Sequence, residues 1–244
     1  MPIVINLLID IGNSSVKASY AKGGLLEEII RYDGEDVYGF IANLAMRREI
    51  DVIAISTVRR EGALFFKELE SECNKLIVVD SSMELPVINR YKSPETLGSD
   101  RILSAIAAGH IFPERDVMIF DFGTALTIDF VSGKGEYLGG NISLGLRGRF
   151  RALNDYTQRL PLLGNPSEIA DVGSTTKEAI ESGVVLGLIF EVSGYIKEYP
   201  NHIYIFTGGD AIYFAEKLKS SIFVVYNLVL MGLARVAENY AKSE

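Results

Sequence analysis

The chain has 244 residues, of which 48% are hydrophobic, a proportion that provides for a substantial core and excludes a disordered protein. Lys and Arg number 24 against 32 Asp and Glu, and this formal net charge of −8 argues against nonspecific nucleic-acid binding, which needs clustered cations. Cys73 is the only cysteine and there are two histidines, so neither an internal disulfide nor a zinc site built from these residues is expected.

The N-terminal apolar run, Ile3 to Asp10, lacks a preceding basic region and is predicted to be a strand rather than a signal peptide. No apolar stretch is expected to reach membrane-spanning length. We therefore expect a cytoplasmic protein with no membrane partner.

The first part of the chain alternates short apolar runs with helical patterns. It predicts, in chain order, strands over 3–10, 15–21 and 26–32, a helix over 37–49, a strand over 52–56, a helix over 63–74, a strand over 76–79 and a helix over 102–108. His110 is expected near the C-terminus of that last helix, as a cap or packing residue rather than a catalyst.

A polar, turn-like segment at 113–116 suggests a boundary between a half formed by 1–115 and a half formed by 116–244. The second half repeats the order of the first. Its pattern predicts strands over 117–121, 126–132 and 136–141, helices over 146–157 and 176–197, a strand over 202–206, and helices over 210–219 and 229–240.

One short pattern occurs twice in the chain. Leu8 to Ser15 recurs as Ile119 to Leu126, offset by 111 residues, and each copy is an apolar run ending in Asp-x-Gly before a second apolar run. The strand Val52–Thr57 is likewise echoed by Ile203–Gly208. Such strand–turn–strand units can bind phosphate and a cation, although two unrelated hairpins would also fit a lone Asp-x-Gly. The repeated order predicts an α/β protein with a mixed sheet in each half.

The doubled Asp-x-Gly hairpin resembles the acetate and sugar kinase, Hsp70 and actin superfamily. This resemblance implies a duplicated ribonuclease-H-like (actin-like ATPase) fold, with an ATP cleft between two mixed-sheet halves. Within the superfamily the chain resembles the type III pantothenate kinases nearly from end to end. The motifs that carry the resemblance are Asp10–Lys17, Pro94–Arg101, Asp121–Thr127, Gly139–Ile142, Thr176–Ile180 and Thr207–Ala211.

The family resemblance implies ATP-dependent phosphorylation of pantothenate to 4′-phosphopantothenate, the first step of coenzyme A biosynthesis, by a homodimer. The alternative is a nucleotide-binding regulatory (transcriptional accessory) protein of the same fold with little turnover. Two further readings, another small-molecule kinase of the superfamily and an actin-like filament former, fit this compact chain less well. The chain has no G-x-x-x-x-G-K-[ST] pattern, which argues against a P-loop kinase.

By resemblance, the ATP phosphates contact the first motif and one residue of the second. Asp10 is expected to serve Mg²⁺ through water, and Asp121 a monovalent cation, K⁺ or NH₄⁺, although Asp121 could instead serve Mg²⁺. The expected ATP-binding residues are Asp10, Ile11, Gly12, Asn13, Ser14, Ser15, Val16, Lys17 and Thr124.

The substrate motif supplies the expected catalytic residue, Asp100, as acceptor of the proton from the pantothenate hydroxyl; the alternative is a helix N-cap. Arg101 has the planar fork that suits a carboxylate, unless it is an exposed surface residue. Thr176 corresponds to a substrate contact at a dimer interface, or caps its helix. The expected substrate-binding residues are Tyr91, Gly98, Ser99, Asp100, Arg101 and Thr176.

Two positions depart from the family pattern. Ser14 stands where Thr is usual and keeps the hydroxyl, whereas Leu144 replaces a Pro after the Gly-Gly segment and leaves the conformation of that turn open. Arg147, Arg149 and Arg151 form a basic stripe, interpreted as a solvated helix face or, less favoured, a nucleotide or dimer contact.

Overall fold

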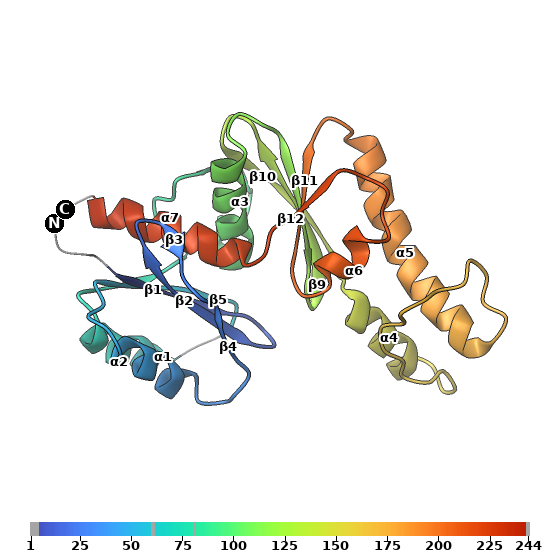
Figure 1. Cartoon of the computed structure of the whole chain (residues 1–244), viewed down its shortest axis with the longest axis horizontal. Coiled ribbons are helices and arrows are strands. Elements are labelled where there is room, and N and C mark those ends of the chain that lie inside the picture. Colours follow the sequence, from blue (N-terminus) through green and yellow to red (C-terminus); the bar gives the residue numbers. More distant parts are fainter. Residues whose placement is uncertain (1–4, 60–61, 81, 243–244) are drawn as a thin grey trace. The chain divides into compact units, whose positions relative to one another are not determined.

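A computed structural model of the chain describes residues 5–59, 62–80 and 82–242. The described chain divides by its contacts into two compact units (Figure 1). Unit 1 contains the residues up to 113, residues 134–138 and the residues from 227 onward. Unit 2 contains residues 114–133 and 139–226.

Unit 1 is built on a mixed sheet in the order β3-β2-β1-β5-β6, with β4 also pairing with β2. β1 is antiparallel to β2 and parallel to β5, which is in turn parallel to β6. The central strands β1 and β5 are buried along most of their length, where their residues are mainly apolar, and their polar residues lie at or near the strand ends. The strands are β1 (Asn6–Ile11), β2 (Val16–Lys22), β3 (Leu25–Leu26), β4 (Ile30–Tyr32), β5 (Val52–Thr57) and β6 (Lys75–Val78).

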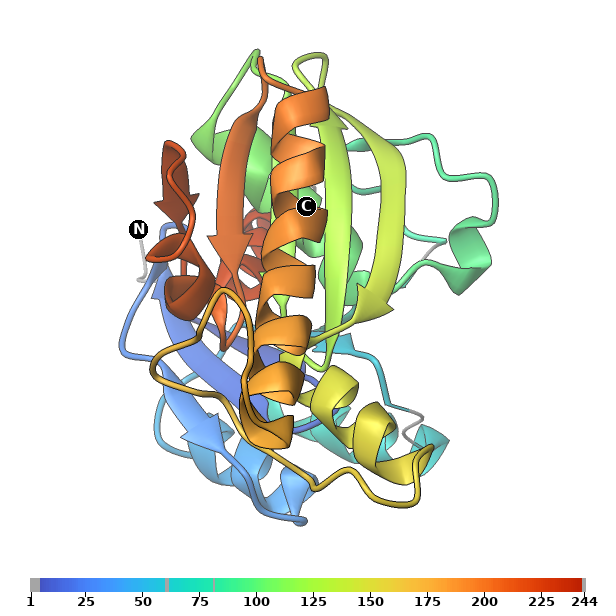
Figure 2. The ribbon, with the colours of Figure 1, turned by 90° about the vertical axis from the view of Figure 1, so that its right-hand side faces the viewer.

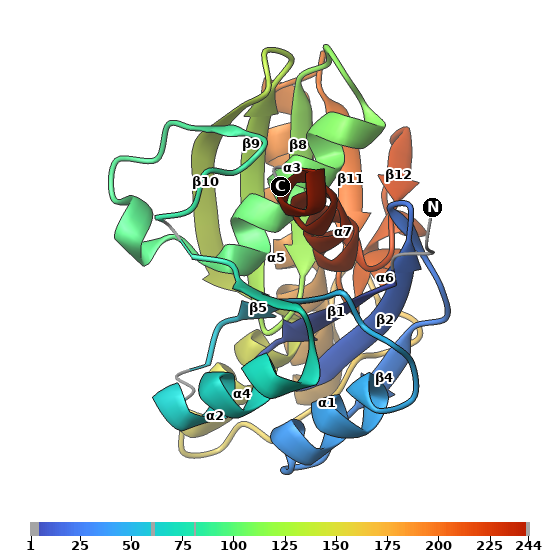
Figure 3. The ribbon, with the colours of Figure 1, turned by 90° about the vertical axis from the view of Figure 1, so that its left-hand side faces the viewer.

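Helices cover both faces of this sheet (Figure 3). Ile41 and Leu44 of α1 pack with Leu7 and Ile9 of β1 in one core, and α7 contacts β1 and β5 as well as α3. The helices of unit 1 are α1 (Val37–Ala45), α2 (Ala63–Leu69), α3 (Ser99–Ile111) and α7 (Leu228–Lys242), with 3₁₀ turns at Glu70–Glu72 and Pro94–Thr96.

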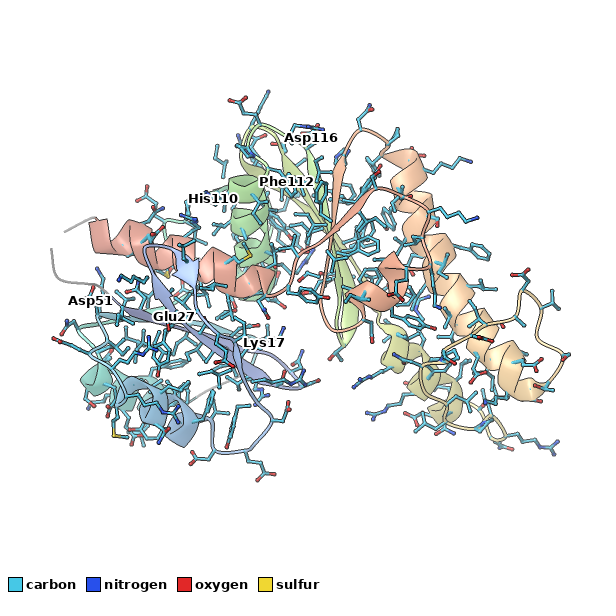
Figure 4. The ribbon with its side chains drawn as sticks, viewed as in Figure 1. Lys17, Glu27, Asp51, His110, Phe112 and Asp116 are labelled. Carbon is cyan, nitrogen blue, oxygen red and sulfur yellow. The ribbon has the colours of Figure 1, made fainter. Side chains whose placement is uncertain are left out.

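The C-terminal helix α7 belongs to unit 1, whereas the sequence assigned all of 116–244 to the second half. The physical reason is apolar burial: Leu230, Leu233 and Val236 of α7 are fully buried. His110 lies in the last turn of α3, as expected, and is exposed (Figure 4).

Unit 2 repeats the strand order of unit 1. Its sheet contains the order β10-β9-β8-β11-β12, with β8 antiparallel to β9 and parallel to β11, which is parallel to β12. A sixth strand, β7 (Ile88–Asn89), is parallel to the first residues of β10, which belong to unit 1. The duplicated mixed sheet predicted from the sequence is thereby confirmed. The strands are β8 (Val117–Phe122), β9 (Ala125–Ser132), β10 (Glu136–Leu144), β11 (Ile203–Thr207) and β12 (Ile222–Val224).

The helices of unit 2 are α4 (Leu146–Asp155), α5 (Thr176–Glu198) and α6 (Ala211–Ala215). Helix α5 runs along the sheet (Figure 2), and Val184, Val185 and Leu188 enter a core shared with Phe120 and Phe206. Contrary to the expectation from the sequence, α5 is long and apolar enough to cross a membrane, with a mean hydropathy of 1.5 over its best window. By itself this is weak evidence, since core helices of soluble proteins have the same composition.

Most predicted elements are confirmed, with shifted ends. The predicted strand over 26–32 is two short strands, β3 and β4, and α6 has five residues where ten were expected. The sequence analysis missed β7 (Ile88–Asn89) and β12, because strands of two or three residues are too short to show a period. The start of the first predicted strand, before residue 5, lies outside the described residues.

Candidate active site

The first Asp-x-Gly motif forms the hairpin between β1 and β2 in unit 1. Asp10 lies opposite Lys17, and Ile11 opposite Val16, so that four residues, Gly12 to Ser15, form the loop. The N–H of Gly12 donates to the carbonyl of Ser15 at 3.0 Å and closes it. Lys17 projects from the start of β2 (Figure 4).

The second motif forms the corresponding hairpin in unit 2, with a loop that is one residue shorter. Asp121 lies opposite Thr127, and Phe122 opposite Leu126, so the loop is Gly123 to Ala125, closed by a hydrogen bond of 3.0 Å from the Gly123 N–H to the Ala125 carbonyl. The offset of 111 between the copies therefore holds only as far as the loop. Beyond it, Leu126 corresponds to Val16 rather than to Ser15, a correction to the equivalence read from the sequence.

A hydroxyl residue lies beside each of the two aspartates on the neighbouring parallel strand. Ser56 of β5 is opposite Asp10, and Thr207 of β11 is opposite Asp121. This is the match between 52–57 and 203–208 that the sequence predicted. Each unit therefore places an Asp and a hydroxyl side by side at the carboxyl ends of adjacent strands, where ligands bind in α/β sheets.

Burial dominates the electrostatics of Asp10. It raises the pKa of the carboxyl from 3.8 to about 6, despite the attraction of Lys17 and a hydrogen bond from Ser56, and the negative charge of Asp100 adds to the rise. Asp100, from the distant substrate motif, thus lies close enough to Asp10 to repel it. Two carboxylates beside one lysine form a site suited to a cation and a phosphate.

Asp100 stands in the first turn of α3, whose N-cap is Gly98. The interpretation of Asp100 as the N-cap is therefore wrong. Its carboxylate instead accepts the N–H of Arg101 at 2.9 Å. Ser99 is buried, and its hydroxyl lies 3.0 Å from that of Ser56 and bonds to the Thr57 carbonyl. These bonds fix the start of α3 to the end of β5.

Arg101 is only 6% exposed, which rules out an ordinary surface arginine. Its guanidinium lies 5.7 Å from the centre of the Tyr91 ring, within cation–π range. The Tyr91 ring in turn contacts Tyr137, which is fully buried. The structure therefore places Tyr91 and Arg101, both expected to bind the substrate, side by side.

In unit 2, two glycines allow the backbone to approach the second hairpin. Gly208 has a φ of +90°, and a Cβ there would lie 2.4 Å from Oδ1 of Asp121. A Cβ on Gly145 would lie 2.2 Å from the Gly123 carbonyl oxygen. The N–H of Gly145 donates to the carbonyl of Thr124 at 3.2 Å. Backbone from two distant segments is thus packed around Asp121 and Thr124.

Asp210 follows the Gly208-Gly209 turn, and its N–H donates to the Phe122 carbonyl at 3.2 Å. Burial raises the pKa of its carboxyl, while Arg147 and a hydrogen bond of 3.2 Å from the Asn165 amide oppose the rise. One residue of the basic stripe therefore has a defined interaction: the charge of Arg147 attracts the Asp210 carboxylate, next to the second hairpin.

The other two arginines of the stripe have different surroundings. Arg149 forms an ion pair with Glu191 of α5 and donates to the Leu144 carbonyl at 2.8 Å, whereas Arg151 is exposed. Leu144 ends β10 directly before α4, so the Gly139-Gly140 segment is strand and not a turn.

Thr176 is the exposed first residue of α5 and not its cap. The cap is Thr175, whose hydroxyl accepts the N–H of Glu178 at 3.2 Å. The Glu178 carboxylate accepts the N–H of Ser174, the residue before the cap, at 2.8 Å, which resembles a capping box shifted by one residue. The capping interpretation of Thr176 is therefore wrong, and its role as a substrate contact stays a prediction.

The residues present suit hard cations. No group of three or more His, Cys, Asp or Glu side chains is gathered anywhere in the described part of the chain. Asp10 with its neighbouring hydroxyl and carboxylate fits Mg²⁺, which keeps several waters and takes phosphate oxygens as ligands. Asp121, with the backbone of Gly208 packed closely against it, offers a carboxylate to a hard cation.

Sequence reasoning missed several residues that shape the site: Ser56, Arg59, Gly145 and Asn165. Ser56 could have been found from its place at the end of a strand parallel to β1. Arg59 and Gly145 bond to the hairpin loops and Asn165 bonds to Asp210, all from loops, and no local pattern in the sequence predicts these contacts.

Comparisons with known proteins agree with the motifs. The family described as type III pantothenate kinase matches residues 6–198. The type III pantothenate kinase of Phocaeicola vulgatus is 39% identical over 236 residues, which cover 95% of this chain and 97% of that protein.

Solved structures are similar in fold at lower identity. A chain provisionally described as a Baf family transcriptional activator from Campylobacter jejuni has a TM-score of 0.66 and 21% identity, covering 97% of this chain and 99% of its own. A ROK hexokinase from Thermus thermophilus has a TM-score of 0.51 and 12% identity, with coverage of 99% and 100%. Together with the two mixed sheets, these neighbours show the actin-like ATPase and sugar kinase fold.

Proposed function

This chain belongs to the type III pantothenate kinase family, and on that premise we propose which of its residues carry each part of the reaction. Its function is the ATP-dependent phosphorylation of pantothenate, the first step of coenzyme A biosynthesis. The alternative of a regulatory protein with little turnover is not favoured, because the curated relatives are named as kinases.

The first hairpin binds the β- and γ-phosphates of ATP in this proposal. Lys17 supplies a positive charge beside Asp10, and the backbone of Asn13 to Ser15 supplies N–H groups. Bound Mg²⁺ would neutralise phosphate charge near Asp10, which holds it through water. In unit 2, Thr124 contacts ATP and Asp121 holds K⁺ or NH₄⁺, supported by the close backbone at Gly208.

Asp100 orients the pantothenate hydroxyl and accepts its proton as the hydroxyl oxygen attacks the γ-phosphorus and ADP leaves. A loose phosphoryl-transfer transition state demands little of the base, so an ionised Asp suffices. Support comes from its position at a helix N-terminus and from its proximity to Asp10.

Arg101 binds the pantothenate carboxylate through its planar fork, and the Tyr91 ring orients the guanidinium. Gly98 and the backbone of Ser99 line the same site, while the Ser99 hydroxyl fixes the motif to β5. Thr176 completes the substrate contacts from the partner subunit.

A homodimer is supported by the outer side of α5, which carries a stripe of Gly183, Gly187, Phe190 and Gly194. Phe190 is 68% exposed, and small residues at helical spacing let two helices approach closely. This role also accounts for the high hydropathy of α5, and we place the enzyme in the cytoplasm without a membrane or nucleic-acid partner.

The observation that carries the catalytic assignment is the meeting of Asp10, Ser56, Ser99 and Asp100 at the ends of β1 and β5. The test is ADP release with ATP, Mg²⁺ and pantothenate, run in K⁺ and in Na⁺. Turnover that depends on pantothenate and on K⁺ supports both the catalytic and the cation assignments. ADP release without any pantothenate dependence would contradict them.

A further inference from the structure

One short segment after β5 holds three consecutive carbonyls of the first hairpin. The N–H of Val58 donates to the Ile11 carbonyl at 3.2 Å. The Nε of Arg59 donates to the carbonyl of Gly12 at 2.7 Å, and its Nη2 to the carbonyl of Asn13 at 3.4 Å. Arg59 thus reaches 46 or 47 residues back along the chain to the backbone of the loop.

The arginine itself is anchored. Its N–H donates to the hydroxyl of Thr57 at 3.1 Å, and that hydroxyl lies 3.3 Å from the Arg59 carbonyl. Thr57 is the last residue of β5, which lies beside β1 in the sheet, so the base of the Arg59 side chain is fixed relative to the hairpin. Because the guanidinium is planar, its Nε and Nη2 donors keep a fixed relation to each other.

These bonds decide which way the loop amides face. In a trans peptide the C=O and the following N–H point in opposite directions. Holding the Gly12 and Asn13 carbonyls toward Arg59 therefore turns the N–H groups of Asn13 and Ser14 to the opposite side of the loop. Successive N–H groups facing one side form a concavity that binds anions.

We propose that Arg59 is a positioning residue for ATP, whose guanidinium holds the loop Gly12–Ser15 in the conformation that receives the β- and γ-phosphates. The inference rests on the proposed phosphate-binding role of this loop. Arg59 acts through the loop, since its guanidinium bonds reach backbone carbonyls. Arg59 lies outside the Asp-x-Gly motif, just after the end of β5. The conformation of the motif's loop therefore depends on a residue that the motif itself does not contain.

The test is calorimetric titration of Mg·ATP into the enzyme without pantothenate. Losing a charge-assisted hydrogen bond predicts that Arg59→Ala raises the Kd for Mg·ATP about tenfold. Arg59→Lys keeps the charge but can donate to only one of the two carbonyls. It recovers about a third of the loss in Mg·ATP affinity, measured as log Kd. Arg59→Gln, which keeps one NH₂ donor but loses the charge and the second donor nitrogen, serves if the alanine variant fails to fold. The control, Arg31→Ala, removes an exposed arginine paired with Asp33 and leaves the Kd unchanged.

Two further measurements distinguish a specific effect of Arg59 on ATP binding from an overall destabilisation of the protein. The KM for pantothenate stays within about twofold, because Arg101 and not the loop binds that substrate. Hydrogen exchange at the amides of residues 12–15 becomes faster in Arg59→Ala. An unchanged Kd for Mg·ATP, or equal rises of both KM values with a lowered Tm, would overturn the inference. Loss of pantothenate dependence in the unmodified enzyme would contradict the proposed function instead, and the ATP titration would still test Arg59.

Discussion

Ser56 of β5 lies directly opposite Asp10 of β1, and its hydroxyl is hydrogen-bonded to the Asp10 carboxyl. The bond favours the charged form, yet burial outweighs it and leaves the pKa of Asp10 at about 6. The ligand-free enzyme therefore holds a carboxylate in an environment that favours its protonation, next to the Lys17 charge. With a pKa of about 6 the carboxyl is still mostly ionised at pH 7, as its proposed role in holding Mg²⁺ requires.

This pKa predicts how the stability of the ligand-free protein depends on pH. The folded state binds the Asp10 proton more tightly than the unfolded state, so the contribution of Asp10 is largest below about pH 4 and is lost as the pH rises through 6. The gain in the free energy of unfolding from Asp10→Asn should therefore be about 2–3 kcal/mol larger at pH 8 than at pH 4. Urea unfolding in EDTA measures this, with the exposed Asp33→Asn as control. An equal effect at both pH values would contradict it.

Removing the proposed proton acceptor should damage turnover and spare ATP binding. We expect Asp100→Asn to lower kcat about 100- to 1,000-fold, the range for loss of a general base. The Kd for Mg·ATP should change less than about twofold. Glu95→Gln, an exposed acid in the same motif, is the matched control. Unchanged turnover in Asp100→Asn would remove Asp100 from the mechanism.

The proposed binding of the pantothenate carboxylate by Arg101 is tested by a substitution that keeps the positive charge. Arg101→Lys loses the planar fork and should raise the KM for pantothenate about tenfold with kcat little changed. Arg90→Lys is the control, because Arg90 pairs with Glu136 at 2.7 Å and is largely exposed. If Arg101→Lys altered only kcat, the proposal that Arg101 binds the pantothenate carboxylate would be wrong.

Two adjacent glycines give a matched pair beside Asp121. Gly208→Ala would place a Cβ 2.4 Å from the Asp121 carboxylate at a φ of +90°, whereas a Cβ on Gly209 meets nothing within 4 Å. We expect Gly208→Ala to lower the free energy of unfolding by about 1–3 kcal/mol and to weaken activation by K⁺, with little effect from Gly209→Ala. Urea unfolding and KCl titration of activity provide the measurements. Equal effects of the two changes would argue against a cation site at Asp121.

The proposed dimer predicts that Phe190→Glu produces a monomer. A charge placed at the centre of an apolar contact between helices would be buried without a partner. Light scattering measures the mass, and Phe223→Glu, at another exposed phenylalanine, is the control. A dimer that survives Phe190→Glu would move the interface away from α5.

The sequence alone was sufficient for the features whose signals are contiguous. Both hairpins and the duplicated order of strands were predicted from Asp-Gly turns and apolar periods, and the substrate motif at the start of α3 and the family were predicted from the resemblance of short contiguous motifs. These are encoded within a few neighbouring residues, so no knowledge of long-range contacts was needed.

Only the tertiary structure decided the features that join distant segments. The burial of Arg101, the raised pKa of Asp10, the hold of Arg59 on Gly12 and the packing of α7 in unit 1 each depend on residues tens to hundreds of positions apart. Desolvation and the close approach of backbone segments arise from packing between distant residues. They cannot be predicted from the type of a single residue. For that reason an Asp in a motif could be recognised from the sequence, but its charge state and supporting residues could not.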